Sequence, residues 1–375
     1  ILSIQIVSRA RQSGLQLSPK ALFQKQTIAE LAEIVTTQAA TTDDYKTVSG
    51  DIVLTPIMNR FFEIEHDNIS HWNQSLLFNA KETITFNQLD RIANQLIQHH
   101  DVLRLRFIKV SNEWSGTHNG TYTAAFEEEV ESENQIKSVI EQHQEAIDIQ
   151  QGPLLRLVLI NAPKTDRQWV LMIAHHLVVD GVSWRVILED FEQLLSQINT
   201  EQTLCLPGKT NSFLQWSHSL ATLTSSDAIR GDIDYWQEQA SKPRKAFPLN
   251  DVESNCEGDV VTTSIGFSVD QTQTILQELP RSLHLRAHET LITALSMALS
   301  CYSKHDNIAI ETEGHGREDL IDGFDHSRTV GWFTSVYPLI ISLPESRDIT
   351  EQIRAVKQQL TDIPQNGFSY GLLRY

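Results

Sequence analysis

The residues best suited to acid–base chemistry are two adjacent histidines, His175 and His176, followed by Asp180 and Gly181. Before them, WVLMI at 169–173 is short, apolar and partly β-branched, which predicts a buried strand. After them, apolar residues recur at helical spacing. The polar side chains are therefore expected where a strand passes into a helix. Such a turn holds them rigidly and directs the unpaired N–H groups of the helix toward a bound ligand.

More than one interpretation of this stretch is open. A pair of adjacent histidines is, taken alone, more often buried and hydrogen-bonded than reactive. A metal site formed by the two histidines and Asp180 is less favoured, because adjacent histidines rarely bind one ion and no further nitrogen or sulfur ligand is near. We expect Asp180 to be structural and to pair with an arginine, for which Arg185 is a candidate.

Two further stretches carry candidate groups. In IAIETEGHGREDL at 308–320, a strand is expected to end at Glu313, and glycines flank the histidine that follows. A carboxylate at a strand terminus can be partly desolvated, which suits it to proton transfer, although a solvated acidic loop is the simpler alternative. In TVGWFTSVYPLII at 329–341, an aromatic turn leads into a strand with Tyr337 near its start. Considered without the other stretches, this one is expected to be part of the hydrophobic core.

Composition limits the class of protein. A chain of 375 residues with 40% hydrophobic and 21% charged residues predicts a soluble globular protein of two or three domains. A formal net charge of −18 argues against nucleic acid or an anionic membrane as partner, and no apolar run reaches the length of a membrane span. Cys205, Cys256 and Cys301 lie far apart without a CxxC spacing, which argues against a disulfide framework or a zinc site and favours a reducing cytoplasm.

The order of predicted elements indicates an α+β fold. Two helices come first, the second with a capping box from Thr27 to Glu30. After a polar linker, helices alternate with mixed strands, without the glycine motif of a dinucleotide site or a P-loop. A similar series, with strands predicted at 262–269 and 308–313, follows a break near Lys242. The predicted regions are a helical segment at 1–37, a linker at 38–52, and two lobes at 53–225 and 226–375.

Together these stretches resemble the condensation-domain superfamily of nonribosomal peptide synthetases. AHHLVVDGVSWRVILEDF at 174–191 is similar to the HHxxxDGxSW signature of that superfamily. ETEGHGRE, TVGWFTSVYP, the final PQNGFSYGLLRY and HWNQS at 71–75 match the pattern of its epimerization branch. ILSIQIVSRAR and TIAELAEIV, near the N-terminus, are similar to the C-terminal part of a peptidyl carrier domain.

The resemblance implies two chloramphenicol-acetyltransferase-like αβ sandwich lobes in a V shape, preceded by a partial helical carrier bundle. It implies an isomerase that epimerizes, from L to D, the α-carbon of a carrier-bound aminoacyl or peptidyl thioester. His176 and Glu313, one from each lobe, would move the proton, and Tyr337 would donate to the enolate or supply a proton. The catalytic residues implied are His176, Glu313 and Tyr337, and the supporting residues are His175, Asp180, Gly181 and Ser183.

The resemblance also implies a cofactor and partners. The cofactor would be 4′-phosphopantetheine on a carrier serine immediately before Ile1, with no metal and no pyridoxal phosphate. The partners would be the carrier domain in cis, an upstream adenylation domain and a downstream condensation domain. The chain would then be an excerpt of a longer cytoplasmic polypeptide, whose second lobe continues past Tyr375. Two rival functions stay open: a condensation domain that forms an amide bond, and a non-catalytic module that docks a carrier.

Overall fold

The computed structural model describes residues 6–7, 9–10, 13–17, 21–22, 25, 27–37, 48–64, 66–118, 123–243, 260–321, 323–346 and 348–375. The chain divides into two compact units. The first unit contains Ile1–Ser226, His315–Thr334 and Tyr375, and the second contains Asp227–Gly314 and Ser335–Arg374. The sequence prediction assigned the whole of 226–375 to one lobe, whereas the contacts group 315–334 with the first unit. Cys256 lies outside the described residues.

The first unit is built on a four-stranded sheet of order β4–β9–β8–β7, with two antiparallel pairs and one parallel pair, β7 with β8. A three-stranded antiparallel sheet of order β3–β6–β5 lies in the same unit. The strands of this unit are β1 (Leu15–Gln16), β2 (Thr36–Thr37), β3 (Asp51–Ile52), β4 (Asn73–Asn79), β5 (Leu105–Val110), β6 (Glu113–His118), β7 (Ala125–Glu129), β8 (Leu155–Ala162) and β9 (Arg167–His175). Its helices are α3 (Ile28–Ile34), α4 (Pro56–Glu63), α5 (Phe86–His99), η2 (Asp101–Arg104), η3 (Glu133–Gln135), α6 (Ile136–Glu145), η4 (His176–Val178), α7 (Gly181–Asn199) and α8 (Phe213–Leu223).

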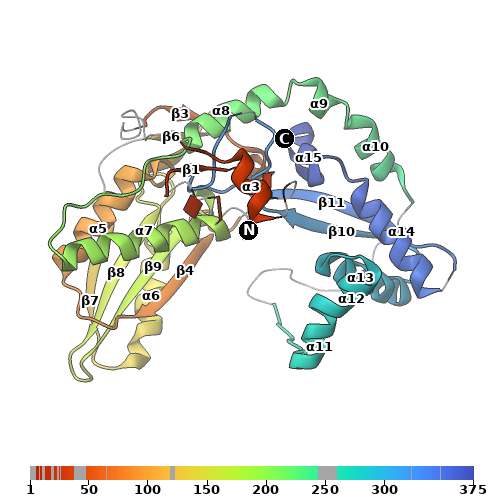
Figure 1. The fold of residues 1–375 in the computed structure, drawn as a ribbon. Coiled ribbons are helices and arrows are strands. Elements are labelled where there is room, and N and C mark those ends of the chain that lie inside the picture. Colours follow the sequence, from red (N-terminus) through yellow and green to blue (C-terminus); the bar gives the residue numbers. More distant parts are fainter. Residues whose placement is uncertain are drawn as a thin grey trace. The chain divides into compact units, whose positions relative to one another are not determined.

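Burial explains why the central strands form where they do. β8 and β9 are almost continuously apolar and buried, as expected for inner strands that are covered by helices. Helices α5 and α7 contact each other beside this sheet (Figure 1). α5 begins at a capping box in which the Thr85 hydroxyl accepts from the Gln88 N–H and the Gln88 side chain accepts from the Thr85 N–H. The capping box predicted from Thr27 to Glu30 is confirmed at the start of α3.

The second unit places helices against a two-stranded antiparallel sheet of β10 and β11. Its elements are α9 (Asp227–Arg230), α10 (Ile233–Ser241), α11 (Val269–Gln273), η6 (Thr274–Glu278), α12 (Leu279–Leu283), α13 (Ala287–Ser303), β10 (Asn307–Gly314), β11 (Ser335–Ser342), α14 (Ile349–Thr361), η7 (Pro364–Gly367) and α15 (Phe368–Arg374). A core cluster of Leu339, Ile341, Leu343 and Val356 joins β11 to α14. Figure 1 shows α14 alongside β11.

Two predicted strands differ from the structure. The strand predicted at 262–269 is wrong: residues 262–268 form no regular element and are exposed, and Val269 begins a helix. A strand needs neighbours for its N–H and C=O groups, and an alternating pattern cannot supply them alone. The sequence also predicts a strand at 103–110; the observed strand starts at Leu105, because Asp101–Arg104 forms a 3₁₀ turn. None of the helices described is long and apolar enough to cross a membrane.

Candidate functional site

The two histidines lie, as predicted, where a strand passes into a helix. β9 ends at His175, the 3₁₀ turn η4 begins at His176, and α7 begins at Gly181. Backbone hydrogen bonds fix the turn from both sides, since His175 N–H donates to the Leu154 carbonyl at 2.9 Å and His176 N–H donates to the Trp72 carbonyl at 2.8 Å. The imidazoles are therefore held by an inner strand of the sheet and a helix of 19 residues.

His175 is a core side chain with no exposed surface. Its Nε2 lies 3.0 Å from the Ile69 carbonyl oxygen, and its Nδ1 accepts from the Leu177 N–H at 3.2 Å. This pattern requires the proton on Nε2 and leaves Nδ1 unprotonated. Burial, as the largest cause, lowers the pKa of His175 from 6.5 to about 4, so that the ring is neutral at neutral pH. These contacts fix the His175 ring in the turn, and its supporting role stays a prediction.

His176 is only partly buried, and its nitrogens are in different surroundings. Nδ1 lies 2.9 Å from the carbonyl oxygen of Val179, an acceptor, so Nδ1 must carry a proton. In the neutral ring, Nε2 then holds a lone pair that can accept a proton. The imidazole packs on the indole of Trp332, with ring centroids 4.4 Å apart and an angle of 36° between planes. This arrangement leaves Nε2 as the nitrogen that can accept a proton.

Asp180 caps helix α7 and forms a buried ion pair. Its Oδ1 accepts from the Ser183 N–H at 2.7 Å, and Oδ2 accepts from the Phe333 N–H at 3.2 Å. An Arg317 nitrogen lies 3.3 Å from each carboxylate oxygen. The expectation of Arg185 as partner is wrong, because Arg185 is exposed on α7. Arg317 is the functional residue that the sequence reasoning missed, although it lies within the quoted EGHGRE stretch.

Ser183 joins the same network with every hydrogen-bonding position of its hydroxyl in use. The hydroxyl donates to the Gly331 carbonyl at 2.8 Å, and accepts from the Gly331 N–H at 2.9 Å and from Arg317 at 3.2 Å. Arg317 also donates to the carbonyls of His326 and Thr329, both at 2.8 Å. Parts of all three stretches that carry candidate groups therefore meet at the start of α7, which explains why 315–334 belongs to the first unit.

Glu313 and Tyr337 lie in the second unit on paired strands. Glu313 is opposite Val336 and Tyr337 is opposite Thr312, so their side chains leave opposite faces of the two-stranded sheet. Glu313 is exposed, which agrees with the solvated alternative rather than with a partly desolvated carboxylate. The ring of Tyr337 packs against the backbone of Gly367, where an added Cβ would lie 2.2 Å from a ring carbon. The meeting of His176 with Glu313 stays a prediction.

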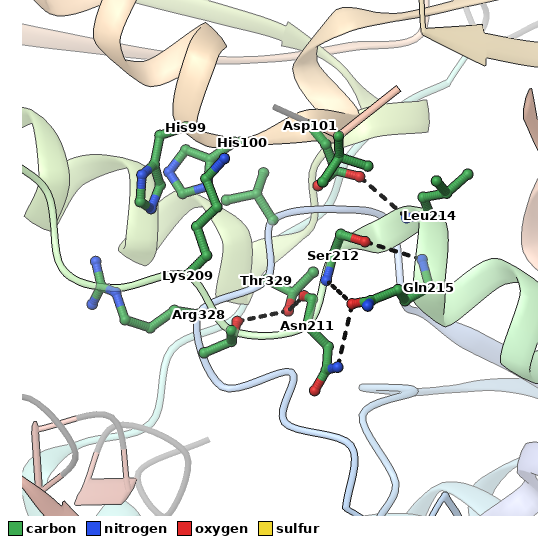
Figure 2. A pocket seen from close by; sticks show the side chains of 13 residues that line it. His99, His100, Asp101, Lys209, Asn211, Ser212, Leu214, Gln215, Arg328 and Thr329 are labelled. Carbon is green, nitrogen blue, oxygen red and sulfur yellow. Dashed lines mark hydrogen bonds between the residues drawn. The ribbon is translucent and has the colours of Figure 1, made fainter. Parts of the chain in front are cut away.

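A cavity of about 480 Å³ opens elsewhere in the first unit, and none of the predicted site residues lines it. Figure 2 shows His99, His100, Lys209 and Arg328 on one side, and Asp101 with the start of α8 on the other. Asp101 accepts from the N–H groups of Phe213 and Leu214 at that helix start, at 3.3 and 3.1 Å.

Among the described residues, the group that could hold a metal ion consists of three side chains beside this cavity. Ligand atoms of His99, His100 and Asp190 lie within 4.8 Å of one another. Asp190 is already engaged, because it accepts from His100 Nε2 at 2.8 Å and pairs with Arg328. Burial, as the largest cause, lowers the pKa of His99 to about 3. An ion bound here would compete with the Arg328 guanidinium for Asp190.

Comparison with known proteins identifies the family. The pattern of the Condensation domain family matches residues 48–375. The chain belongs to this family. It is 37% identical to one of the linear gramicidin synthase proteins of Brevibacillus parabrevis and 34% identical to surfactin synthase subunit 1 of Bacillus subtilis (strain 168), in both cases over 100% of this chain. The chain spans 5% and 11% of the length of these relatives, which belong to nonribosomal peptide synthetases.

Solved structures share the α+β fold of this chain. The epimerization domain from the third module of tyrocidine synthetase B superposes with a TM-score of 0.81 at 31% identity, over 88% of this chain and 75% of that chain. The X-domain from teicoplanin biosynthesis superposes with a TM-score of 0.73 at 15% identity, over 88% of this chain and 75% of that chain, which is a likeness of fold. The predicted fold class and family are confirmed, and the V shape stays a prediction.

Proposed function

We propose that this condensation-family chain epimerizes the α-carbon of an aminoacyl or peptidyl thioester delivered by a peptidyl carrier domain. The observation that carries the proposal is the His176 imidazole, held with Nδ1–H on the Val179 carbonyl and with Nε2 able to accept a proton. The likeness to a tyrocidine synthetase epimerization domain supports this reaction over others of the family. The 4′-phosphopantetheine arm and its carrier are part of the substrate, and adenylation and condensation domains are the expected neighbours in the assembly.

Inversion requires proton removal from one face of the carbon and return to the other. Glu313 would remove the α-proton in one direction and become a carboxylic acid, while the C–H electron pair passes to the thioester oxygen as an enolate. His176, protonated on Nε2, would stabilise that oxygen or return a proton from the opposite face, and the roles would exchange with direction. Each positioned acid or base contributes on the order of 10²–10⁴-fold to such a reaction.

The remaining site residues set the geometry of the turn. Asp180 caps α7 by accepting from the Ser183 N–H, and Arg317 balances the charge of Asp180. The partial positive charge at the N-terminus of the helix would assist at a developing oxyanion. Gly181 is exposed at the first position of α7, where an added Cβ would meet no atom within 4 Å. A side chain at this position would not be excluded by packing. Tyr337 leaves the opposite sheet face from Glu313, and its role as a donor to the enolate stays a prediction.

The test supplies a carrier domain loaded with an L-aminoacyl-phosphopantetheine thioester and follows α-hydrogen exchange in deuterated water by mass spectrometry. The wild type should incorporate deuterium and produce D-aminoacyl thioester. His176→Ala and Glu313→Gln should each lower the rate by about 10²–10⁴-fold. Glu311→Gln is the matched control, because Glu311 is exposed and leaves the same face of β10 two residues away. Normal exchange in both site variants would show that the roles are wrongly assigned.

Amide-bond formation is the second candidate, because the matching family is named for condensation. The same Nε2 of His176 would then accept the proton of an attacking amine. A second carrier loaded with an acceptor aminoacyl group separates the two functions. Dipeptide without deuterium incorporation would establish condensation, and deuterium incorporation without dipeptide would establish epimerization. Carrier binding with neither product would indicate a docking module.

A further inference from the structure

We infer that Trp332 is a positioning residue that fixes the plane of the His176 imidazole, an inference that rests on the proposed function of His176. The indole lies on one face of the imidazole, at 4.4 Å between ring centroids. Nδ1 is held by the Val179 carbonyl at 2.9 Å. These two contacts fix the plane of the ring, and Nε2 is the nitrogen left for proton transfer in the proposed function.

The backbone on both sides of Trp332 is tied to the helix that follows His176. Gly331 exchanges two hydrogen bonds with the Ser183 hydroxyl, at 2.8 and 2.9 Å. Phe333 N–H donates to Asp180 at 3.2 Å. Asp180 and Ser183, at the start of α7, therefore hold the backbone on both sides of Trp332, and the His176 imidazole lies in the turn directly before these two residues. Positioning of this kind matters because a displacement of about 1 Å at a reacting group can cost about 10²-fold in rate.

The backbone before Trp332 is closely packed. An added Cβ at Gly331 would lie 2.2 Å from the ring of Phe213, so the backbone before Trp332 sits directly on that ring. On its other side the indole contacts Phe61, with ring centroids 6.0 Å apart and 74° between planes. Phe61 in turn meets His175 at 5.8 Å. Trp332 thus contacts both Phe61, which packs on His175, and the imidazole of His176.

The indole of Trp332 carries a buried donor. Trp332 is 7% exposed, and its Nε1–H has no hydrogen-bond partner among the described residues. Such a group costs about 1–3 kcal/mol, a penalty that phenylalanine would avoid. Trp332→Phe therefore should fold, keeping an aromatic face on His176 while removing the unpaired donor.

The test compares Trp332→Leu, Trp332→Phe and the control Trp114→Leu in the full chain. Trp114 stacks on Phe62 at 4.5 Å in the same unit and contacts none of the site residues in the described contacts. Trp332→Leu should lower kcat for α-hydrogen exchange by about 10–100-fold with little change in KM, and Trp332→Phe should recover most of that loss. Trp114→Leu should leave both constants near the wild-type values. A kcat for Trp332→Leu within about twofold of the wild type would overturn the inference.

A spectroscopic arm is independent of turnover. In protein with ¹³C-labelled histidine, the His176 ring Cε1–H signal, assigned by its loss in His176→Ala, should move downfield in Trp332→Leu because the ring current of the indole is removed. It should move less in Trp332→Phe and stay in place in Trp114→Leu. An unchanged signal in Trp332→Leu would refute the placement of the indole. If the wild type shows no exchange, the proposed function fails, and this arm still decides whether Trp332 holds His176.

Discussion

Replacing Arg317 by methionine should lower the free energy of unfolding by about 3–5 kcal/mol, because it leaves a buried carboxylate without its counter-charge. The exposed fractions of the paired side chains are 0% for Arg317 and 7% for Asp180. After the change, Asp180 keeps only the N–H groups of Ser183 and Phe333. Methionine preserves much of the side-chain volume, so that the loss reports charge and hydrogen bonds more than a cavity.

Urea denaturation followed by tryptophan fluorescence measures this loss, as the change in midpoint multiplied by the slope. The matched control is Arg185→Met on the exposed face of α7, which should change the free energy of unfolding by no more than about 0.5 kcal/mol. In a double-mutant cycle with Asp180→Asn, the coupling energy with Arg317→Met should be about 1–3 kcal/mol. Equal costs for the two arginine variants, or a coupling energy near zero, would refute the assignment of Arg317 as the partner of Asp180.

Three further results are expected in the same denaturation assay. The pKa of His175 is about 4 in the folded protein against 6.5 in the unfolded chain, so the unfolded chain takes up the proton first. The free energy of unfolding should therefore fall as pH drops from 6.5 to 4, by up to about 1.4 kcal/mol per pH unit. His175→Asn should reduce this slope. Gly331→Ala, whose Cβ would lie 2.2 Å from the Phe213 ring, should cost about 1–3 kcal/mol, whereas Gly266→Ala, with no atom within 4 Å, should be nearly neutral. Ser183→Ala should cost about 1–3 kcal/mol, because both backbone groups of Gly331 lose their partner, and a loss below the error of the assay would contradict this network.

Local patterns in the sequence predicted the elements that bear the first half of the site. The apolar run before His175 predicted the strand, and the helical spacing after Gly181 predicted α7. These predictions succeeded because strand and helix periodicity is a property of neighbouring residues. The short, continuously apolar run of β9 is also typical of a strand that is buried on both faces. The predicted strand at 262–269 failed for the complementary reason, since a strand depends on partners that the local pattern does not specify.

The arginine that pairs with Asp180 could not be predicted from neighbouring residues. Arg185 and Arg317 have the same charge, and Arg185 is five residues from Asp180 in sequence, yet a helix directs it to solvent. Arg317 is distant in sequence and lies on a loop whose path returns to the first unit. Only the packed chain brings its guanidinium to Asp180. The same is true of Trp332, which the sequence marked as part of an aromatic turn and the structure places on His176.

The sequence by itself determined the family, the α+β composition, and the two histidines with Asp180 at a strand-to-helix turn, because motif and periodicity are written in adjacent residues. The tertiary structure decided which nitrogen of His176 is protonated, which arginine neutralises Asp180, and which sheet faces Glu313 and Tyr337 occupy. Those features depend on hydrogen-bond partners and strand register, contributed by segments far apart in the chain. Proton transfer depends on such atoms, and their positions are set by packing.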